Sequence, residues 1–297
     1  MQGQLLNDVR QYAETHSPGA SVIQTPIAGM VILRELRPGE LQYAVSKPLI
    51  AVVLQGGKYV SIGNLAFDFG AGESLLITAE VPTVSQITHA TPAAPYYSLV
   101  LELDIMVIES LLAEISSSSA KLNGALQVER TEDEVVDVLS RMLKLFRRPA
   151  ALPILQQSLV RELHYWLLTG SHGGAIQALG AIDSHTQRLG RAIGLIRAEY
   201  ASPLRMERLA ACAGMSLSGF HTHFRALTSL TPLQFQKQLR LIEARRIMLA
   251  DGATASDAAF AVGYESIPHF TREYSRMFGN SPGRDIREAR GRRANAA

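Results

Sequence analysis

The chain has 297 residues, of which 47% are hydrophobic and 19% are charged, a balance typical of a folded protein with about two domains. Its single cysteine excludes an internal disulfide framework and a zinc site built from several cysteines. The first residues lack a basic stretch followed by an apolar one, and no run of about 18 apolar residues occurs. We therefore expect a cytoplasmic protein with no membrane partner.

The net charge of +2 is unevenly distributed along the chain. Residues 1–183 carry 12 Lys and Arg against 18 Asp and Glu, a net charge of −6, whereas residues 184–297 carry 17 against 9, a net charge of +8. A basic module attracts polyanions, and about half a dozen cations on one face suffice for salt-dependent binding to nucleic acid. The charge by itself fits a solvated basic surface equally well.

Short apolar runs separated by turn signals fill the chain from about residue 20 to 103. Examples are VILREL followed by RPGE, and LIAVVLQ followed by GG. Turn signals spaced roughly eight to twelve residues apart between β-prone runs predict an antiparallel barrel or sandwich, and no helix of normal length fits. We assign residues 1–104 to this β-domain and expect it to be an antiparallel β-barrel.

The apolar period becomes helical after residue 104. Helices are predicted over IMVIESLLAEI, over TEDEVVDVLSRMLKLF with Thr131 as its cap, and over ILQQSLVRELHYWLL. In the last of these, one face is formed by Leu155, Leu159, either Glu162 or Leu163, and Trp166. Trp166 is interpreted as a packing residue rather than a ligand contact.

These helices need a partner surface, which is either the β-domain or a second subunit. Dimerisation through the apolar faces at 131–146 and 154–168 is therefore one hypothesis. The stretch TGSHGG at 169–174 has the composition of a linker. We assign residues 105–183 to a helical connecting segment, a candidate for dimerisation, that contains this linker, and residues 184–297 to a separate DNA-binding domain with two helix-turn-helix units.

The basic C-terminal region contains a duplicated unit. Residues 216–232 align with residues 266–282, and each copy has a helix of small residues, a tight turn containing Gly, and a second helix with an aromatic stripe. This order predicts two helix-turn-helix units. In the second copy Ser266 is the expected N-cap and Pro268 falls in the first helical turn. The aromatic positions that pair between the copies are Phe220 with Phe270 and Phe224 with Tyr274.

One long helix is predicted between the copies, from the cap at Thr231 to the stop at Gly252. Its apolar positions predict a buried stripe that fixes the separation of the two units; the stripe comprises Phe235, Leu239, Ile242 and Leu249. Two units at a fixed separation imply two segments of DNA major groove about one turn, roughly 34 Å, apart.

Residues 188–290 resemble the DNA-binding domain of the AraC/XylS family of bacterial transcription regulators. The matching text is LAACAGMSLSGFHTHF, TPLQFQKQLRLIEARRIML and AAFAVGYESIPHFTREYSRMFGNSP. Residues 20–105, with LQGGKYVSIG, FDFGAGESLLIT and EVPTVSQIT, resemble the cupin-like effector domain of one branch of that family. The resemblance implies a sequence-specific regulator of transcription, an activator that works with RNA polymerase, although repression is also open.

The resemblance also implies which residues contact the bases of double-stranded DNA. They are Ser218, His221 and Thr222 in the first unit, and Ile267, Pro268, Thr271 and Arg272 in the second. The chain departs from the family at Thr222, where arginine is common, and its own repeat aligns Thr222 with Arg272. Because arginine can bond guanine with two hydrogen bonds and threonine cannot, Arg272 is the foremost candidate.

Two other functions fit parts of the sequence. A basic module without sequence preference describes a DNA-architectural protein. A cupin fold suits a metal enzyme, but such a site needs two or three His and a carboxylate, and His89 is the only histidine between residues 20 and 105. No catalytic residues, cofactor or metal are therefore predicted. The β-domain is expected to bind an effector, either a small molecule or a partner protein, whose contact residues are unknown.

Overall fold

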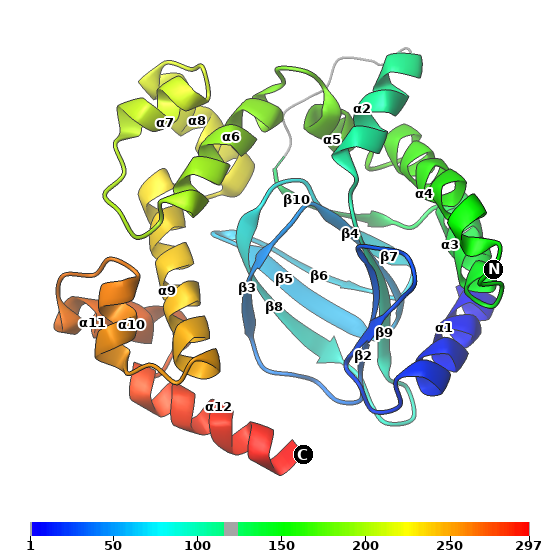
Figure 1. Ribbon diagram of the computed structural model, residues 1–297, viewed down its shortest axis with the longest axis horizontal. Coiled ribbons are helices and arrows are strands. Elements are labelled where there is room, and N and C mark those ends of the chain that lie inside the picture. The colour runs from blue at the N-terminus through cyan, green and yellow to red at the C-terminus, as the bar shows by residue number, and fades with distance from the viewer. Residues whose placement is uncertain (1, 116–123, 297) are drawn as a thin grey trace. The chain divides into compact units, whose positions relative to one another are not determined.

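Figure 1 shows the computed structural model, which describes the fold of residues 2–115 and 124–296. The chain forms two compact units. The first comprises Met1–Gly190 with His223–Ser229, and the second comprises Arg191–Thr222 with Leu230–Ala297. Each unit has its own hydrophobic core. Within the described residues, no helix is both long and apolar enough to cross a membrane.

Two antiparallel sheets form the β-domain of the first unit. The larger sheet has the strand order β1 (Val22–Gln24), β2 (Met30–Glu35), β9 (Tyr96–Glu102), β4 (Leu49–Gln55), β7 (Glu73–Ile77) and β10 (Leu126–Arg130). The smaller sheet has the order β3 (Gln42–Ser46), β8 (Val81–His89), β5 (Gly57–Ile62) and β6 (Leu65–Gly70). The predicted antiparallel β-domain is confirmed, but the described strands form a sandwich-like pair of sheets and not the closed barrel that we expected.

Helices cover the outer face of the larger sheet, as Figure 1 shows for α1, α3 and α4. The helices of the first unit are α1 (Gln2–His16), α2 (Ile105–Glu114), α3 (Asp133–Phe146), α4 (Leu152–Thr169) and α5 (Gly173–Gly180). The core between them and the sheet includes Val9, Ile32, Leu99, Leu139 and Leu163. The apolar face of α3 thus covers the protein's own sheet. Neither α1 nor strand β10 was predicted from the sequence.

Two details of the predicted helices are wrong. Thr131 does not cap α3: the N-cap position is Glu132, and the Thr131 N–H donates to the Gly72 carbonyl at 2.8 Å because the chain is still leaving β10 there. Leu155 does not belong to the buried face of α4, since 48% of it is exposed; of the two alternatives Glu162 and Leu163, Leu163 is the buried one.

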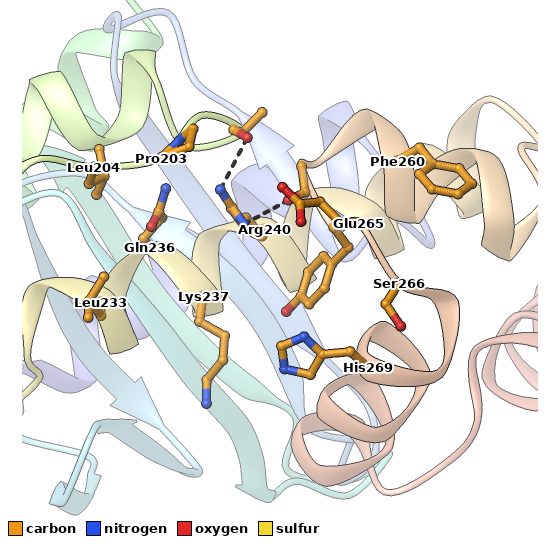
Figure 2. A pocket seen from close by; sticks show the side chains of 13 residues that line it. Pro203, Leu204, Leu233, Gln236, Lys237, Arg240, Phe260, Glu265, Ser266 and His269 are labelled. Atoms are coloured by element: carbon orange, nitrogen blue, oxygen red, sulfur yellow. Dashed lines mark hydrogen bonds between the residues drawn. The ribbon is translucent and has the colours of Figure 1, made fainter.

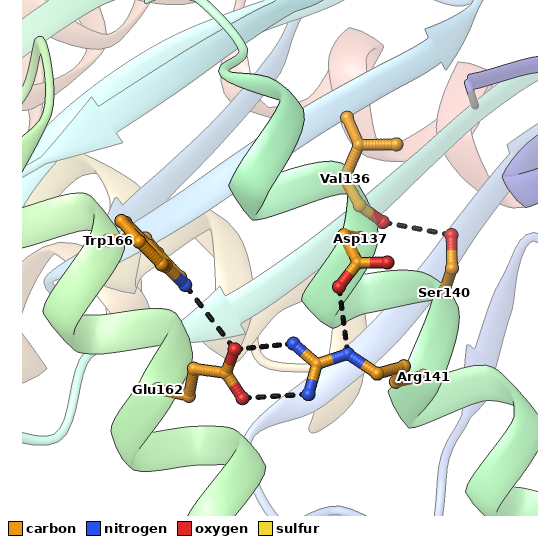
Figure 3. A network of polar contacts seen from close by, with 6 residues as sticks. All are labelled: Val136, Asp137, Ser140, Arg141, Glu162 and Trp166. Atoms are coloured by element: carbon orange, nitrogen blue, oxygen red, sulfur yellow. Dashed lines mark hydrogen bonds and ion pairs between the residues drawn. The ribbon is translucent and has the colours of Figure 1, made fainter.

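Trp166 packs against the core, as the sequence analysis expected. Its ring N–H donates to Glu162 Oε1 at 3.4 Å. The Glu162 carboxylate also accepts hydrogen bonds from both terminal nitrogens of Arg141, which lies on α3 (Figure 3). Arg141 also reaches Asp137 on its own helix at 2.9 Å. The arginine therefore connects two helices through two carboxylates.

The stretch with linker composition, residues 169–174, is a packed turn. His172 is only 3% exposed, and its Nε2 lies 2.9 Å from the Ser74 hydroxyl on β7. This hydrogen bond holds the turn between α4 and α5 against the larger sheet. Burial lowers the pKa of His172 to about 4 because the charged ring is poorly solvated there.

The rest of the chain is helical. Its helices are α6 (His185–Ala198), α7 (Met206–Cys212), α8 (Leu217–Thr228), α9 (Pro232–Ala250), α10 (Ala255–Ala261), α11 (Ile267–Phe278) and α12 (Pro282–Ala296). The predicted start of α9 is confirmed, because the Thr231 hydroxyl and the Gln234 side chain form a reciprocal capping box. The predicted fold class, an N-terminal antiparallel β-domain followed by helices and an all-α C-terminal region, is confirmed.

The buried stripe predicted along α9 is half right. Phe235 and Leu239 are buried, but Ile242 and Leu249 are only partly so, and the helix buries Leu241 and other residues on a further side. The helix is therefore covered on more than one face. A single buried stripe is expected for a helix that packs on one surface, whereas α9 is packed on several sides within the second compact unit.

Candidate nucleic-acid interface

Helices α10 and α11 form the second helix-turn-helix unit. Phe270 and Tyr274 are completely buried, and the rings of Tyr274 and Phe278 lie 4.4 Å apart. The predicted aromatic face is thus the packing face. Ser266 occupies the N-cap position with extended backbone, but its side chain makes no capping hydrogen bond; Pro268 lies in the first turn.

The opposite face of α11 is open to solvent. Pro268 and Arg272 are exposed, and Ile267 and Thr271 are half-buried beside them. Arg272 makes no hydrogen bond or ion pair with any other residue that the structure describes. The next arginine along the helix, Arg276, is by contrast paired with Glu273 at 3.4 Å. The Arg272 side chain is therefore the one able to reach outward from this helix without breaking an ion pair.

The first helix-turn-helix unit consists of α7 and α8 and repeats this arrangement. Phe220 and Phe224 are completely buried, while Ser218, His221 and Thr222 are exposed. The Thr222 hydroxyl donates to the Ser218 carbonyl at 3.1 Å, which leaves its oxygen lone pairs and its methyl group for an outside partner. All of the residues expected to contact bases thus lie on the exposed or partly exposed sides of α8 and α11.

A buried ion pair connects the second helix-turn-helix unit to the flanking helices α9 and α12. The Arg245 guanidinium on α9 bonds both carboxylate oxygens of Asp285 on α12, at 2.7 and 3.2 Å, and the Tyr274 hydroxyl donates to the same carboxylate at 2.7 Å. Arg245 also lies over the Phe278 ring, 5.4 Å from its centre. Three helices are therefore joined behind the exposed face of α11.

The space between the two sheets of the β-domain contains polar groups that the sequence analysis did not identify. Lys58 lies on the same face of β5 as the buried Val60 and Ile62, since side chains alternate along a strand. It makes no ion pair or hydrogen bond with another described residue, and burial lowers the pKa of its ammonium group. Its residue as a whole is only half-buried, so its position is at the rim of the interior rather than in the centre.

Tyr96 and Ser98 are completely buried on β9 and alternate with Tyr97 and Leu99, whose side chains face the helices. Both hydroxyl groups lack a hydrogen-bond partner of normal geometry. Burial raises the pKa of Tyr96 to about 12, and the nearby Ser98 hydroxyl offsets a little of that. A Cβ on Gly56, two residues before Lys58, would lie 3.0 Å from the Tyr96 Cα, so the start of β5 abuts Tyr96.

Two matched helix-turn-helix units with outward-facing second helices, preceded by a β-domain with unsatisfied interior polar groups, define a DNA-binding regulator that carries a ligand-binding domain. Comparison with known families agrees. The family described as AraC-type transcriptional regulator N-terminus matches residues 26–175, and the helix-turn-helix domain family matches residues 209–288. The chain belongs to the AraC-type transcriptional regulators, so the predicted resemblance and the predicted regulatory function are confirmed.

Individual relatives match different shares of the chain. The chain is 28% identical over 109 residues to the HTH-type transcriptional activator RhaS of Escherichia coli strain SE11; the match spans 37% of this chain and 39% of that protein. Crystal structures of ToxT from Vibrio cholerae share the fold over most of the chain. The O395 structure has a TM-score of 0.54 at 11% identity, with 86% of this chain and 96% of ToxT covered. A fatty-acid-bound ToxT from strain SCE256 has a TM-score of 0.56 at 10% identity, with 89% and 97% covered.

Proposed function

We propose that the protein recognises two adjacent major-groove segments of an operator through α8 and α11. We further propose that a small molecule bound in the β-domain controls the DNA affinity or the activating ability of the protein. The observation that carries the proposal is the unpaired Arg272 on the exposed face of α11. In this scheme residues 184–297 bind DNA, residues 1–104 bind the effector, and residues 105–183 connect them. The contacts to bases are assigned to Ser218, His221, Thr222, Ile267, Pro268, Thr271 and Arg272.

The two units differ in the chemistry that they offer to DNA. The Arg272 guanidinium can donate to both O6 and N7 of one guanine, which discriminates against other bases by about 1–3 kcal/mol. Thr222, at the equivalent position of the first unit, offers one hydroxyl and a methyl group that can contact thymine. We therefore expect the half-site bound by α11 to be the more strictly specified.

Selection of genomic DNA fragments by the full-length protein tests this proposal. We expect enrichment of a few sites with two half-sites about one turn apart, and Arg272→Ala should relax the preference at one guanine. Arg276→Ala is the matched control, because it removes the same charge from the same helix and should weaken binding to all sequences alike. Uniform, steeply salt-dependent binding that ignores Arg272 would instead identify a DNA-architectural protein.

The effector is proposed to be a small molecule with a carboxylate or a similar acceptor group. Two buried hydroxyls without partners, and a poorly solvated ammonium at the rim of the interior, are costly, and a ligand that accepts hydrogen bonds from them removes that cost. Binding there would shift an equilibrium between forms of different DNA affinity or activating ability. The fatty acid named for ToxT is consistent with this class but belongs to that protein.

Thermal shift and calorimetry with acetate, hexanoate, decanoate and benzoate, each compared with its alcohol, test the effector class. We expect a carboxylate to bind and its alcohol not to, and Lys58→Met to abolish binding. Lys47→Met is the control, since Lys47 is an exposed lysine paired with Glu102 at 3.0 Å. Binding that survives Lys58→Met, or that does not distinguish the acid from the alcohol, would refute this assignment.

Further parts of the proposal concern partners and place of action. The start of α4 leaves Ile154 75% exposed beside a groove of about 490 Å³ that Leu155 and Leu159 help to line, which supports dimerisation through this helix. Sedimentation of the wild type and of Ile154→Glu tests it. The activator RhaS supports an activating role. Action together with RNA polymerase and a cytoplasmic place of action are proposed from the family resemblance. Metal bound to the purified protein would favour the alternative of a cupin-type enzyme.

A further inference from the structure

Arg240, in the middle of α9, lies between the two helix-turn-helix units. Its Nε donates to the Tyr200 carbonyl at 2.6 Å, and its Nη2 donates to the carbonyls of Ala201 and Ser202 at 3.1 and 3.2 Å. These three residues form the loop that leads from α6 into α7, the first helix of the first unit. One face of the guanidinium thus binds the entry to that unit.

The same guanidinium also binds the second unit. Its Nη1 donates to the Gly263 carbonyl at 2.9 Å, and Gly263 lies in the turn between α10 and α11. Figure 2 shows Arg240 at the centre of an open groove, with dashed lines to the two carbonyls that belong to the drawn residues. Four donors of one side chain are therefore used on backbone oxygens of two separate units. A planar arginine can do this, whereas a lysine has no such fork.

Backbone contact between the same segments is unusually close. Gly263 has a φ of +83°, and a Cβ placed on it would overlap the Ala201 carbonyl oxygen. The turn of the second unit therefore rests directly on the loop of the first, and only glycine fits there. One helical turn before Arg240, the Gln236 amide donates to the Tyr200 and Ser202 carbonyls at 2.8 and 2.6 Å, which strengthens the same junction.

The duplicated units differ in this junction. The turn between α7 and α8 has four residues, 213–216, whereas the turn between α10 and α11 has five, 262–266. The longer turn is the one that contains Gly263. The extra residue thus occurs in the turn whose carbonyl Arg240 binds and whose backbone meets Ala201.

We propose that Arg240 is a positioning residue that sets the separation and relative orientation of the two units, and so the half-site spacing that the protein accepts. This inference rests on the proposed recognition of two half-sites. It assigns Arg240 no contact with DNA. Inserting one base pair between half-sites moves one of them by roughly 3.4 Å and rotates it by roughly 35°, so rigid units must distinguish such operators.

The test uses the full-length protein, a selected operator, versions with one or two base pairs inserted or removed, and the isolated second half-site. For the wild type we expect an affinity loss of about tenfold or more on a one-base-pair change. Arg240→Met should reduce this ratio to less than about threefold, lower affinity for the optimal operator, and leave the isolated half-site unaffected. Arg246→Met is the control on the same helix; Arg246 pairs with Glu243, and this variant should keep the wild-type ratio.

Outcomes separate this inference from the proposed function. A wild type without any spacing preference refutes recognition of two half-sites and this inference with it. A folded Arg240→Met protein that loses affinity equally on every operator refutes the inference alone. If Arg240→Met does not fold, Arg240→Lys and Gln236→Leu decide in its place: each should weaken the spacing preference, and a wild-type preference in both would overturn the proposal.

Discussion

Replacing Asp285 by alanine should make the second compact unit, Arg191–Thr222 with Leu230–Ala297, unfold far more easily. The stability of the first compact unit, Met1–Gly190 with His223–Ser229, should not change. Asp285 is 6% exposed and accepts two hydrogen bonds from Arg245 and one from Tyr274. Removing one partner of a buried ion pair leaves the other charge uncompensated, which costs about 3–5 kcal/mol. Tyr274 also loses a charged acceptor, but that loss is part of the same network and does not simply add.

The magnitude translates into a large change in melting temperature. For a unit of about 100 residues, 1 kcal/mol shifts the Tm by roughly 4–8 °C, so the expected shift is at least about 12 °C. Tyr274→Phe keeps the ring in the core and removes one hydrogen bond to a charged group, for which we expect about 1.5–3 kcal/mol. Arg284→Ala is the control, since its ion pair with Glu288 is on the surface.

The assay can follow the two units separately. Trp166 is the only tryptophan of the chain and belongs to the first compact unit, so its fluorescence reports the unfolding of that unit. Circular dichroism at 222 nm also reports the helices of the second compact unit. In Asp285→Ala we expect an early loss of helical signal and an unchanged tryptophan transition. An unchanged helical transition would refute the assigned role of the ion pair, and a shift of both transitions would refute its being local.

Three further predictions concern other sites. Burial lowers the pKa of His172 to about 4, so as the pH falls the imidazole is protonated in the unfolded chain before it is protonated in the folded one. The first compact unit should therefore be most stable above about pH 6.5, and its free energy of unfolding should fall by roughly 3 kcal/mol by pH 4. Urea unfolding followed by Trp166 fluorescence checks this, and His172→Gln should flatten the slope. Lys58→Met should stabilise the ligand-free protein by on the order of 1 kcal/mol in the same assay, since it removes a half-buried, poorly solvated ammonium without a partner. Thr222→Arg should add about 1–3 kcal/mol of preference for guanine in the first half-site, measured by competition between operators.

The sequence predicted best what depends on neighbouring residues. The cap at Thr231, the position of Pro268 and the aromatic face of Phe270 and Tyr274 all follow from residues close together in the sequence, and the structure confirms them. The internal repeat made these predictions stronger, because the same pattern appears twice. The assigned base-contacting residues lie on accessible faces, and their contacts with DNA remain a prediction.

The elements that the sequence analysis missed depend on distant partners. Strand β10 has only five residues and is a strand because it pairs with β7, which lies about fifty positions earlier along the chain. His172 lies in a stretch with linker composition, yet it is buried, because its ring is hydrogen-bonded to the hydroxyl of the distant Ser74 on β7. The polar groups at Lys58 and Tyr96 face the interior through strand register, which local composition does not reveal.

Helix α9 shows why a correct element can carry a wrong burial pattern. A single apolar stripe is the expected signal when a helix lies on one surface, but this helix is covered on several sides, so polar residues at the junction must be satisfied there as well. Arg240 and Gln236 meet that requirement with backbone carbonyls. Carbonyl acceptors exist at every residue and leave no trace in the identity of side chains, so sequence patterns cannot single them out. The junction that fixes the geometry of the two helix-turn-helix units is therefore formed by contacts that only the folded structure discloses.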